Sequence, residues 1–194
     1  RGDTDRLLKV LGSIGERATH LHGFLAGYAS FAKLPAPRRE AVAWAAFLER
    51  LGALGAFRLE GALPERPGCC DPAQIEQALL NLIKNAHESG SDPDAVALRL
   101  QADAQELRIE VLDRGPGMSE AVLGQALLPF YSTKRADAGA QGGTGLGLAL
   151  VREIVEAHDG RVALANRRGG GLRVLLRLPA PTIPPNRDGA PPDS

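Results

Sequence analysis

Two asparagines four residues apart, Asn81 and Asn85, have the types and spacing to do chemistry. Side chains four residues apart share one face of a helix, and this pair lies in an otherwise apolar helical pattern. A carboxamide oxygen can bind a hard cation such as Mg²⁺, and a carboxamide N–H can donate to a phosphate oxygen. Taken alone, the pair is explained equally well as two solvated amides on a helix surface.

A second cluster, Asp-Arg-Gly-Pro-Gly-Met at residues 113–118, directly follows a predicted strand. An aspartate at a strand end, here Asp113, can accept a hydrogen bond from an exocyclic amine. The glycines Gly115 and Gly117 let a ligand approach the backbone closely. An ordinary strand-ending turn has the same composition, so this cluster alone leaves both interpretations open.

The third cluster is the glycine-rich stretch 142–148, which leads into a predicted helix. Backbone N–H groups at a helix N-terminus point at an anion, and the helix dipole favours phosphate there. The stretch is not a P-loop, because no Gly-Lys-Ser/Thr follows. It is also a poor dinucleotide fingerprint, because it follows a loop and not a strand. Each cluster is a weak signal alone, whereas the order and spacing of the three are a stronger one.

The elements that must position these clusters mix helices with strands. The Asp71-Pro72 pair marks a helix start, with Asp71 as N-cap and Pro72 at the first helical position. Apolar spacing predicts a helix over 41–54, one from Pro72 that carries Ile75, Ala78, Leu79, Leu82, Ile83 and Ala86, and one over 144–158. Strands are predicted at 56–60, 95–100, 107–112, 161–165 and 172–178. This pattern predicts an α/β protein, a two-layer sandwich.

The N-terminal segment 4–33 carries apolar or small residues in heptad spacing, which predicts a long helix that packs on other helices. Several glycines weaken that helix, so its packing partner must supply much of the stability. Prolines at 35 and 37 end it. The predicted domains are a helical segment at 1–37, a main domain at 38–179 and a disordered tail at 180–194, which is rich in proline.

Composition excludes several classes of function. The chain has 23 Lys and Arg residues and 23 Asp and Glu residues, so its formal net charge is zero. This charge gives no reason to expect binding to nucleic acid or to an anionic membrane. No apolar run approaches the roughly 18 residues that span a bilayer. Cys69 and Cys70 are interpreted as two reduced thiols at a strand end and not as a redox site. His87 and His158 are predicted to be surface residues at helix ends.

Together, the motifs resemble those of the GHKL ATP-binding superfamily. Residues 81–85 resemble its N box, Asp113-x-Gly-x-Gly its G1 box, Pro-Phe-Tyr-Ser-Thr-Lys at 129–134 its F box, and Gly-Thr-Gly-Leu-Gly-Leu at 143–148 its G2 box. All four occur in the family's order, and the resemblance covers residues 42–179. It implies the Bergerat fold, an ATP-binding α/β sandwich.

The resemblance also implies a site for ATP and Mg²⁺. Asp113 would accept from the adenine amino group, Asn85 would hold Mg²⁺, and Asn81 would lie close to the phosphates. Residues 128–142 would form an ATP lid that Phe130 anchors. The other implied contacts are Gly115 and Gly117 in the pocket wall, Thr133 and Lys134 near phosphate, and Gly143, Thr144, Gly145, Leu146, Gly147 and Leu148 along the triphosphate.

Asn81 separates two branches of this superfamily. The ATPases among them (gyrase, MutL-type repair proteins and a heat-shock chaperone) resemble one another in having a Glu there, which activates water. An amide cannot act as a general base at neutral pH, so phosphoryl transfer is favoured over hydrolysis. Phe-Ala-Lys-Leu-Pro-Ala-Pro at 31–37 also resembles the end of the second dimerisation helix in sensor histidine kinases of the nitrogen-regulation type.

The kinase resemblance implies transfer of the ATP γ-phosphate to a histidine and from there to an Asp of a response regulator. It also implies a homodimer through the dimerisation helices and a cytoplasmic domain, with inner-membrane anchoring of the longer protein left open. His20 and His22 lack the surrounding residues of a phosphoacceptor H box. The phosphoacceptor histidine is therefore expected upstream of Arg1.

Some residues depart from the kinase pattern. Glu88 lies one turn after the N box, where many kinases have a basic residue that meets phosphate. Leu172 and Arg173 open the last strand, where a hydroxyl residue is common. Two other interpretations stay open: a nucleotide-sensing module that binds ATP and transfers nothing, and a GHKL ATPase.

Overall fold

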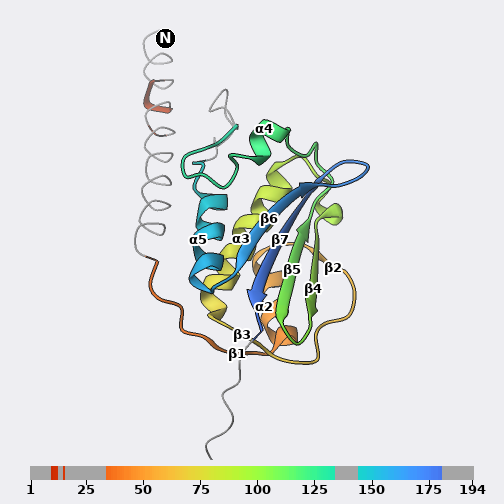
Figure 1. Cartoon of the computed structure of the whole chain (residues 1–194). Coiled ribbons are helices and arrows are strands. Elements are labelled where there is room, and N and C mark those ends of the chain that lie inside the picture. Colours follow the sequence, from red (N-terminus) through yellow and green to blue (C-terminus); the bar gives the residue numbers. More distant parts are fainter. Residues whose placement is uncertain (1–9, 13–14, 16–33, 134–143, 181–194) are drawn as a thin grey trace, which may run out of the picture.

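The computed structural model describes residues 10–12, 15, 34–133 and 144–180. Its helices α2, α3 and α5 lie against one face of a five-stranded sheet, which confirms the predicted two-layer α/β sandwich (Figure 1). The helices are α2 (Trp44–Leu54), α3 (Pro72–Glu88) and α5 (Gly147–Ala157), with one short turn of helix at α4 (Glu120–Leu123). In spatial order the strands are β2 (Arg58–Leu59), β4 (Ala97–Ala102), β5 (Glu106–Leu112), β7 (Leu172–Pro179) and β6 (Arg161–Asn166).

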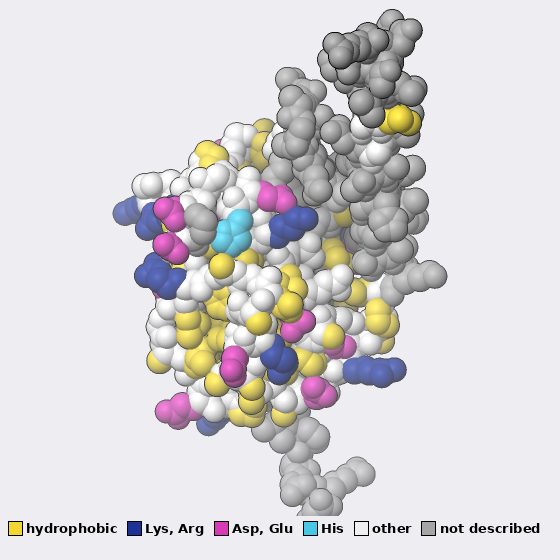
Figure 2. Space-filling model, turned by 180° about the vertical axis from the view of Figure 1, so that it is seen from behind, with side chains coloured by type: hydrophobic (Ala, Val, Ile, Leu, Met, Phe, Trp, Pro, Cys, Tyr) yellow, Lys and Arg dark blue, Asp and Glu magenta, His cyan; other side chains and the backbone are white. Residues whose placement is uncertain are grey.

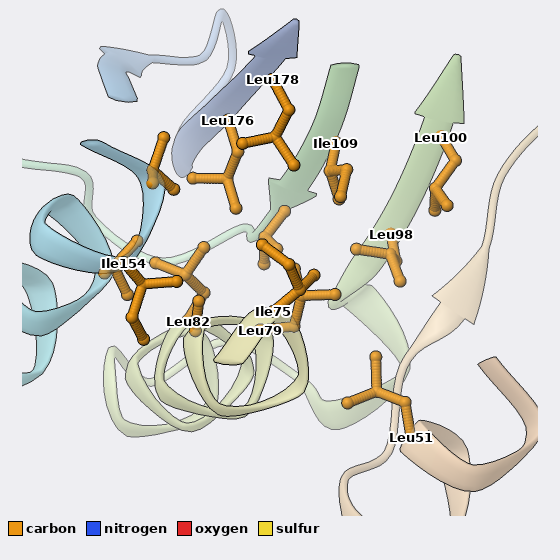
Figure 3. Packing of buried hydrophobic residues seen from close by; sticks show 14 of the residues in the cluster. Leu51, Ile75, Leu79, Leu82, Leu98, Leu100, Ile109, Ile154, Leu176 and Leu178 are labelled. Atoms are coloured by element: carbon orange, nitrogen blue, oxygen red, sulfur yellow. The ribbon is translucent and has the colours of Figure 1, made fainter. Parts of the chain in front are cut away.

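The neighbouring strands of this sheet are antiparallel except for β2, which runs parallel to β4. Alternate residues point to the helices, so β4, β5 and β7 supply Leu98, Ile109 and Leu176 to the core, each fully buried. Leu79 and Leu82 of α3 and Ile154 of α5 meet them from the other layer (Figure 3). Each such buried side chain contributes about 1.5–3 kcal/mol to stability, and together they fix α3 and α5 on the sheet.

The helix predicted over 41–54 is wrong at its start. Residues Glu40–Val42 form strand β1, which pairs antiparallel with β3 (Gly68–Cys70), and α2 begins only at Trp44. Its buried face holds Trp44, Phe47, Leu48 and Leu51, whereas Ala45 and Ala46 are exposed. The two aromatic rings pack edge to face with centroids 5.8 Å apart, and their large apolar area decides which side of the helix is buried.

The start of α3 forms as predicted. Asp71 is the N-cap, and its Oδ1 accepts hydrogen bonds from the backbone N–H groups of Ala73 and Gln74, both at 3.1 Å. Pro72 occupies the first helical position. The apolar residues expected on the core face, from Ile75 to Ala86, are all buried. That orientation leaves Asn81 and Asn85 half-buried on a side of the helix that the core does not cover.

The helices α3 and α5 run antiparallel (Figure 1). A buried histidine joins them at one end. His158 follows α5 and is 2% exposed, so its predicted surface position is wrong. Nε2 of His158 accepts a hydrogen bond from the Asp71 backbone N–H at 3.0 Å, and Nδ1 lies 2.7 Å from the Ile154 carbonyl oxygen. The ring turns inward because it satisfies two backbone groups there. His87, by contrast, is half-buried.

Two predicted segments lie mostly outside the described residues. Residues 10–12 and 15 of the expected N-terminal helix are helical, and the rest of that helix, like residues 181–194 of the expected tail, is not described. The first tail residue, Ala180, donates its backbone N–H to the Gln105 carbonyl oxygen at 2.7 Å. Ala180 is therefore tied to the β4–β5 turn.

The surface of the described part mixes charges of both signs. Figure 2 shows the face that carries the helices, where acidic and basic side chains are interspersed and do not separate into patches. This agrees with the equal numbers of acidic and basic residues in the chain. None of the described helices has the length and apolar character needed to cross a membrane.

Candidate functional site

The two asparagines of α3 lie against the first residue of α5. A Cβ on Gly147 would lie 3.5 Å from Asn81 Oδ1 and 3.6 Å from Asn85 Nδ2. Asn81 also donates from Nδ2 to the Gln77 carbonyl oxygen at 3.0 Å, which fixes its amide. The Asn85 carboxamide makes no hydrogen bond to the described residues and can turn either end outward. The first and third sequence clusters therefore meet at one place.

Among the described residues, no side chain caps the N-terminus of α5. Leu146 is its N-cap residue and supplies no side-chain hydrogen bond to the first turn, so the first N–H groups of the helix depend on other acceptors. Leu146 is itself buried and Leu148 is half-buried, and both hold the start of the helix on the core. Thr144 accepts from the Leu146 N–H at 3.4 Å. This arrangement suits phosphate binding by backbone.

Phe130 and Gly145 bring together the chain on either side of residues 131–144. The Phe130 N–H donates to the Gly145 carbonyl oxygen at 3.0 Å, and both residues have left-handed backbones, with φ of 65° and 69°. A Cβ on Gly145 would lie 2.6 Å from the Phe130 carbonyl carbon. Gly145 is thus required both by its φ and by the close approach. The backbone of Phe130 makes this contact, and its side chain is 54% exposed.

Asp113 lies at the end of β5, and only one of its two carboxylate oxygens accepts hydrogen bonds from the described residues. Its Oδ1 accepts from the backbone N–H groups of Gly115 at 2.9 Å and Leu172 at 3.0 Å. The residue is 6% exposed. Oδ2 accepts no hydrogen bond from the described residues. A buried carboxylate with one oxygen bonded and one left over suits recognition of an external N–H donor.

The Asp113 loop is also tied to the end of α3. Ser91 accepts from the Arg114 backbone N–H at 3.0 Å, and its hydroxyl lies 3.1 Å from that of Ser89, which caps α3. Gly115 has no room for a side chain, since a Cβ there would collide with Ser89. Ser89 follows Asn85 by four residues, about 6 Å along the helix axis. The asparagine pair and the point where the loop contacts α3 therefore both lie in the C-terminal half of that helix.

The turn between β6 and β7 holds the same loop from the opposite side. Arg167 donates to the Asp113 carbonyl oxygen at 2.6 Å, while Arg114 donates to the carbonyl oxygens of Arg168 and Gly170 at 3.3 and 3.4 Å. Burial lowers the pKa of Arg167, and the nearby charge of Arg114 lowers it further. At the far end of the loop, both ends of the Asn166 carboxamide bond to the backbone of Met118.

Most of the sequence-predicted residues are thus described, and several come together. Asn81 and Asn85 lie against Gly147, and Gly115, which bonds to Asp113, lies against Ser89 at the end of α3. Gly145 lies against Phe130 and Gly117 against Asn166, and Thr133 is exposed. Lys134 and Gly143, with the rest of the expected lid from 134 to 142, lie outside the described residues. Of the departures, Glu88 pairs with Lys84 at 3.7 Å, and Leu172 serves Asp113 through its backbone.

Sequence reasoning did not find Ser89, Ser91, Asn166 and Arg167 as parts of this site. Asn166 and Arg167 lie just before three consecutive glycines with positive φ, Gly169 to Gly171. A glycine run of this kind after a strand signals a turn that must approach another backbone closely. The glycine run could therefore have predicted the turn, but not its contact with the loop at 113–118.

The chain matches a known family over more than half its length. A family model described as histidine kinase-, DNA gyrase B-, and HSP90-like ATPase matches residues 70–182. The nitrogen regulation protein NtrY of Azorhizobium caulinodans is 29% identical over 198 residues, which cover 94% of this chain and 24% of NtrY. The C4-dicarboxylate transport sensor protein DctS of Rhodobacter capsulatus is 38% identical over 137 residues, covering 69% of this chain and 19% of DctS.

Solved structures agree on the fold. The Acinetobacter baumannii histidine kinase AdeS superposes with a TM-score of 0.63 at 24% identity, covering 90% of this chain and 84% of AdeS. Full-length ShkA in complex with AMPPNP gives a TM-score of 0.68 at 23% identity, covering 89% of this chain and 38% of ShkA. The chain spans about a fifth to a quarter of the length of the two curated relatives. It belongs to the histidine kinase-, DNA gyrase B- and HSP90-like ATPase family, as an ATP-binding catalytic domain of the sensor histidine kinase type.

Proposed function

We propose that this domain binds ATP with Mg²⁺ and transfers the γ-phosphate to a histidine of a sensor kinase, from which a response-regulator Asp receives it. One observation carries the proposal: the N-terminus of α5, which no described side chain caps, lies against the Asn81–Asn85 pair, and α3 continues from that pair to the loop at 113–118. A phosphate site and a site for an amine donor therefore lie along one helix.

The adenine end of the site would be Asp113. The exocyclic amine of adenine would donate to Oδ2, because Oδ1 already accepts from two backbone N–H groups. Gly115 and Gly117 would form the adjoining wall. A guanine base presents a carbonyl oxygen in place of that amine, so the carboxylate would repel it. Adenine selectivity is the expected result.

The phosphate end would be the start of α5 with Asn81 and Asn85. Among the described residues no group of three or more His, Cys, Asp or Glu side chains could hold a metal ion. The half-buried Asn85 carboxamide fits a cation that the phosphates share, since an amide oxygen is a hard neutral ligand. When bound, Mg²⁺ would neutralise charge on the phosphates. Thr133, Lys134 and the backbone at 143–148 would approach the triphosphate from the lid side.

The proposed reaction is direct displacement. An imidazole nitrogen attacks the γ-phosphorus, the new N–P bond forms as the bond to the bridging oxygen breaks, and ADP leaves. Positioning and charge neutralisation supply most of the catalysis in such transfers. Asn81 supports transfer over hydrolysis because its amide, bonded to the Gln77 carbonyl, cannot take a proton from water. The similarity to NtrY supports assigning the chain to the nitrogen-regulation group, with dimerisation through the N-terminal helices.

Calorimetric titration of the 194-residue chain with ATP, with and without Mg²⁺, tests the proposal. We expect Mg²⁺-dependent binding that the Asp113→Asn variant weakens at least about tenfold, because the new Nδ2 would face the adenine amine donor to donor. Asp103→Asn, an isosteric change in the turn at the opposite end of β5, is the matched control and should bind like wild type. Unchanged affinity in Asp113→Asn would make the adenine assignment wrong.

Phosphate release measured on the same protein separates transfer from hydrolysis. We expect no steady release of inorganic phosphate from Mg·ATP. Steady release that the Asn81→Ala variant abolishes would instead establish an ATPase.

A further inference from the structure

Asn166, the last residue of β6, forms two hydrogen bonds to the backbone of Met118, one with each end of its carboxamide. Oδ1 accepts from the Met118 N–H at 2.9 Å, and Nδ2 donates to the Met118 carbonyl oxygen at 2.7 Å. Two hydrogen bonds from one planar group fix both the position and the orientation of the peptide they hold. The Asn166 side chain is exposed, so this pair adds little to the core and acts mainly on the geometry of the loop.

The same carboxamide also limits which residue can precede Met118. Gly117 has a φ of 75°, and a Cβ there would lie 2.6 Å from Asn166 Oδ1. A glycine is therefore needed both for the left-handed backbone and for the close approach of Asn166. The Met118 side chain beyond it is half-buried against the core. Asn166 thus sets the path of the chain at Gly117.

The loop 113–118 is consequently held at both ends from the β6–β7 turn. Arg167 bonds the Asp113 carbonyl oxygen at the beginning of the loop, and Asn166 bonds Met118 at its end. The loop returns a contact through Arg114, which bonds two carbonyl oxygens of the turn. Between the two anchors lie Gly115 and Gly117, which form the wall of the adenine pocket in the proposed function.

We propose that Asn166 is a positioning residue for adenine: by holding Met118 it keeps the 115–117 wall at the distance from Asp113 that lets the carboxylate receive the adenine amine. This inference rests on the proposed function. Asn166 does not touch the base and acts through the backbone of Gly117 and Met118. A role in hairpin stability alone would lower the affinity for every purine nucleotide by the same factor, whereas positioning acts on the amine contact.

The test is a thermodynamic cycle with two changes, the Asn166→Ala substitution in the protein and the removal of the 6-amino group from the nucleotide. The dissociation constants of Mg·ATP and of the Mg²⁺ complex of purine riboside triphosphate, which lacks the 6-amino group, are measured by calorimetry on wild type and variant. We expect wild type to prefer ATP about tenfold or more and Asn166→Ala to shrink that preference at least about threefold, because coupled groups give non-additive effects. An unchanged preference overturns the proposal, whether both affinities fall together or neither falls.

Arg168→Ala is the matched control. It lies in the same turn, its side chain is exposed, and only its backbone carbonyl contacts the loop, so the preference should stay at the wild-type value. Asn166→Asp keeps the acceptor for the Met118 N–H and loses the donor to the Met118 carbonyl; it should give an intermediate preference and replaces the alanine variant if that one does not fold. A wild-type chain that does not bind Mg·ATP would contradict the proposed function itself, a result distinct from an unchanged preference.

Discussion

The Nε2 atom of His158 lies 3.0 Å from the backbone nitrogen of Asp71 and accepts its hydrogen bond. This contact joins the end of α5 to the start of α3. At the other end of the same helix pair, Gly147 lies against Asn81 and Asn85. The pair is therefore fixed at the end remote from the proposed phosphate site, which limits rotation of one helix against the other.

Replacing His158 should destabilise the fold without changing the site directly. In His158→Leu the Asp71 N–H and the Ile154 carbonyl oxygen lose their side-chain partner inside the protein. An unsatisfied buried polar group costs about 1–3 kcal/mol, so we expect a lower free energy of unfolding by about that amount in urea titrations. His87→Leu, at the half-buried histidine of α3, should cost less. Equal stability of His158→Leu and wild type would contradict the buried role.

The lowered pKa of Asp71 makes the free energy of unfolding depend on pH. Burial acts to raise its pKa, but the backbone N–H groups of Arg38, Gln74 and Ala73 outweigh it and hold the pKa below the usual 3.8. The Asp71 cap therefore contributes its full stability above pH 3.8. It loses that contribution as the pH falls through the lower pKa that Asp71 has in the folded protein. We expect Asp71→Ala to cost about 1 kcal/mol at pH 7. That difference from wild type, followed by urea unfolding, should shrink below about pH 4 and not between pH 5 and 8.

Gly145→Ala should separate the two chain segments that meet at Phe130. A Cβ there would lie 2.6 Å from the Phe130 carbonyl carbon and 2.8 Å from the Tyr131 nitrogen, on a backbone with φ of 69°. Strain at such a position costs on the order of 1–3 kcal/mol. We expect weaker Mg·ATP binding in titrations and a free energy of unfolding that is lower by about 1–3 kcal/mol. Gly61→Ala is the control, because Gly61 also has a positive φ but open space around it.

The two neighbouring cysteines should differ in reactivity. Burial raises the pKa of Cys70 to about 12, with smaller contributions from Cys69, Asp71 and Glu40. Its thiol stays protonated at neutral pH, and the thiolate is the reactive form. We expect iodoacetamide at pH 8 to leave Cys70 unmodified in the native protein and to modify it after unfolding, as peptide mass spectrometry would show. Modification of native Cys70 as fast as of the half-buried Cys69 would contradict this.

Local signals in the sequence were enough for the elements and motifs that depend on neighbouring residues. The Asp71-Pro72 helix start and the core face of α3 form as predicted. The strands predicted at 95–100 and 107–112 form as β4 at Ala97–Ala102 and β5 at Glu106–Leu112. Capping and periodicity are short-range effects, so they can be read from a few adjacent residues.

Contacts between distant residues could not be predicted in this way. Strands β1 and β3 have three residues each, too few to show a period, and each forms because the other is present. His158 resembles a surface residue at a helix end because nothing near it in sequence shows that the Asp71 N–H lies beside it. Asn166 looks like an ordinary turn residue for the same reason, since Met118 is distant in the chain.

The backbone hydrogen bond from Phe130 to Gly145 holds together the two described flanks of the segment at 131–144. Lengthening a segment between two fixed ends costs little free energy, since doubling the length of a loop costs only about 0.6 kcal/mol of closure entropy. Residues inserted between positions 133 and 144 should therefore lower the free energy of unfolding only slightly.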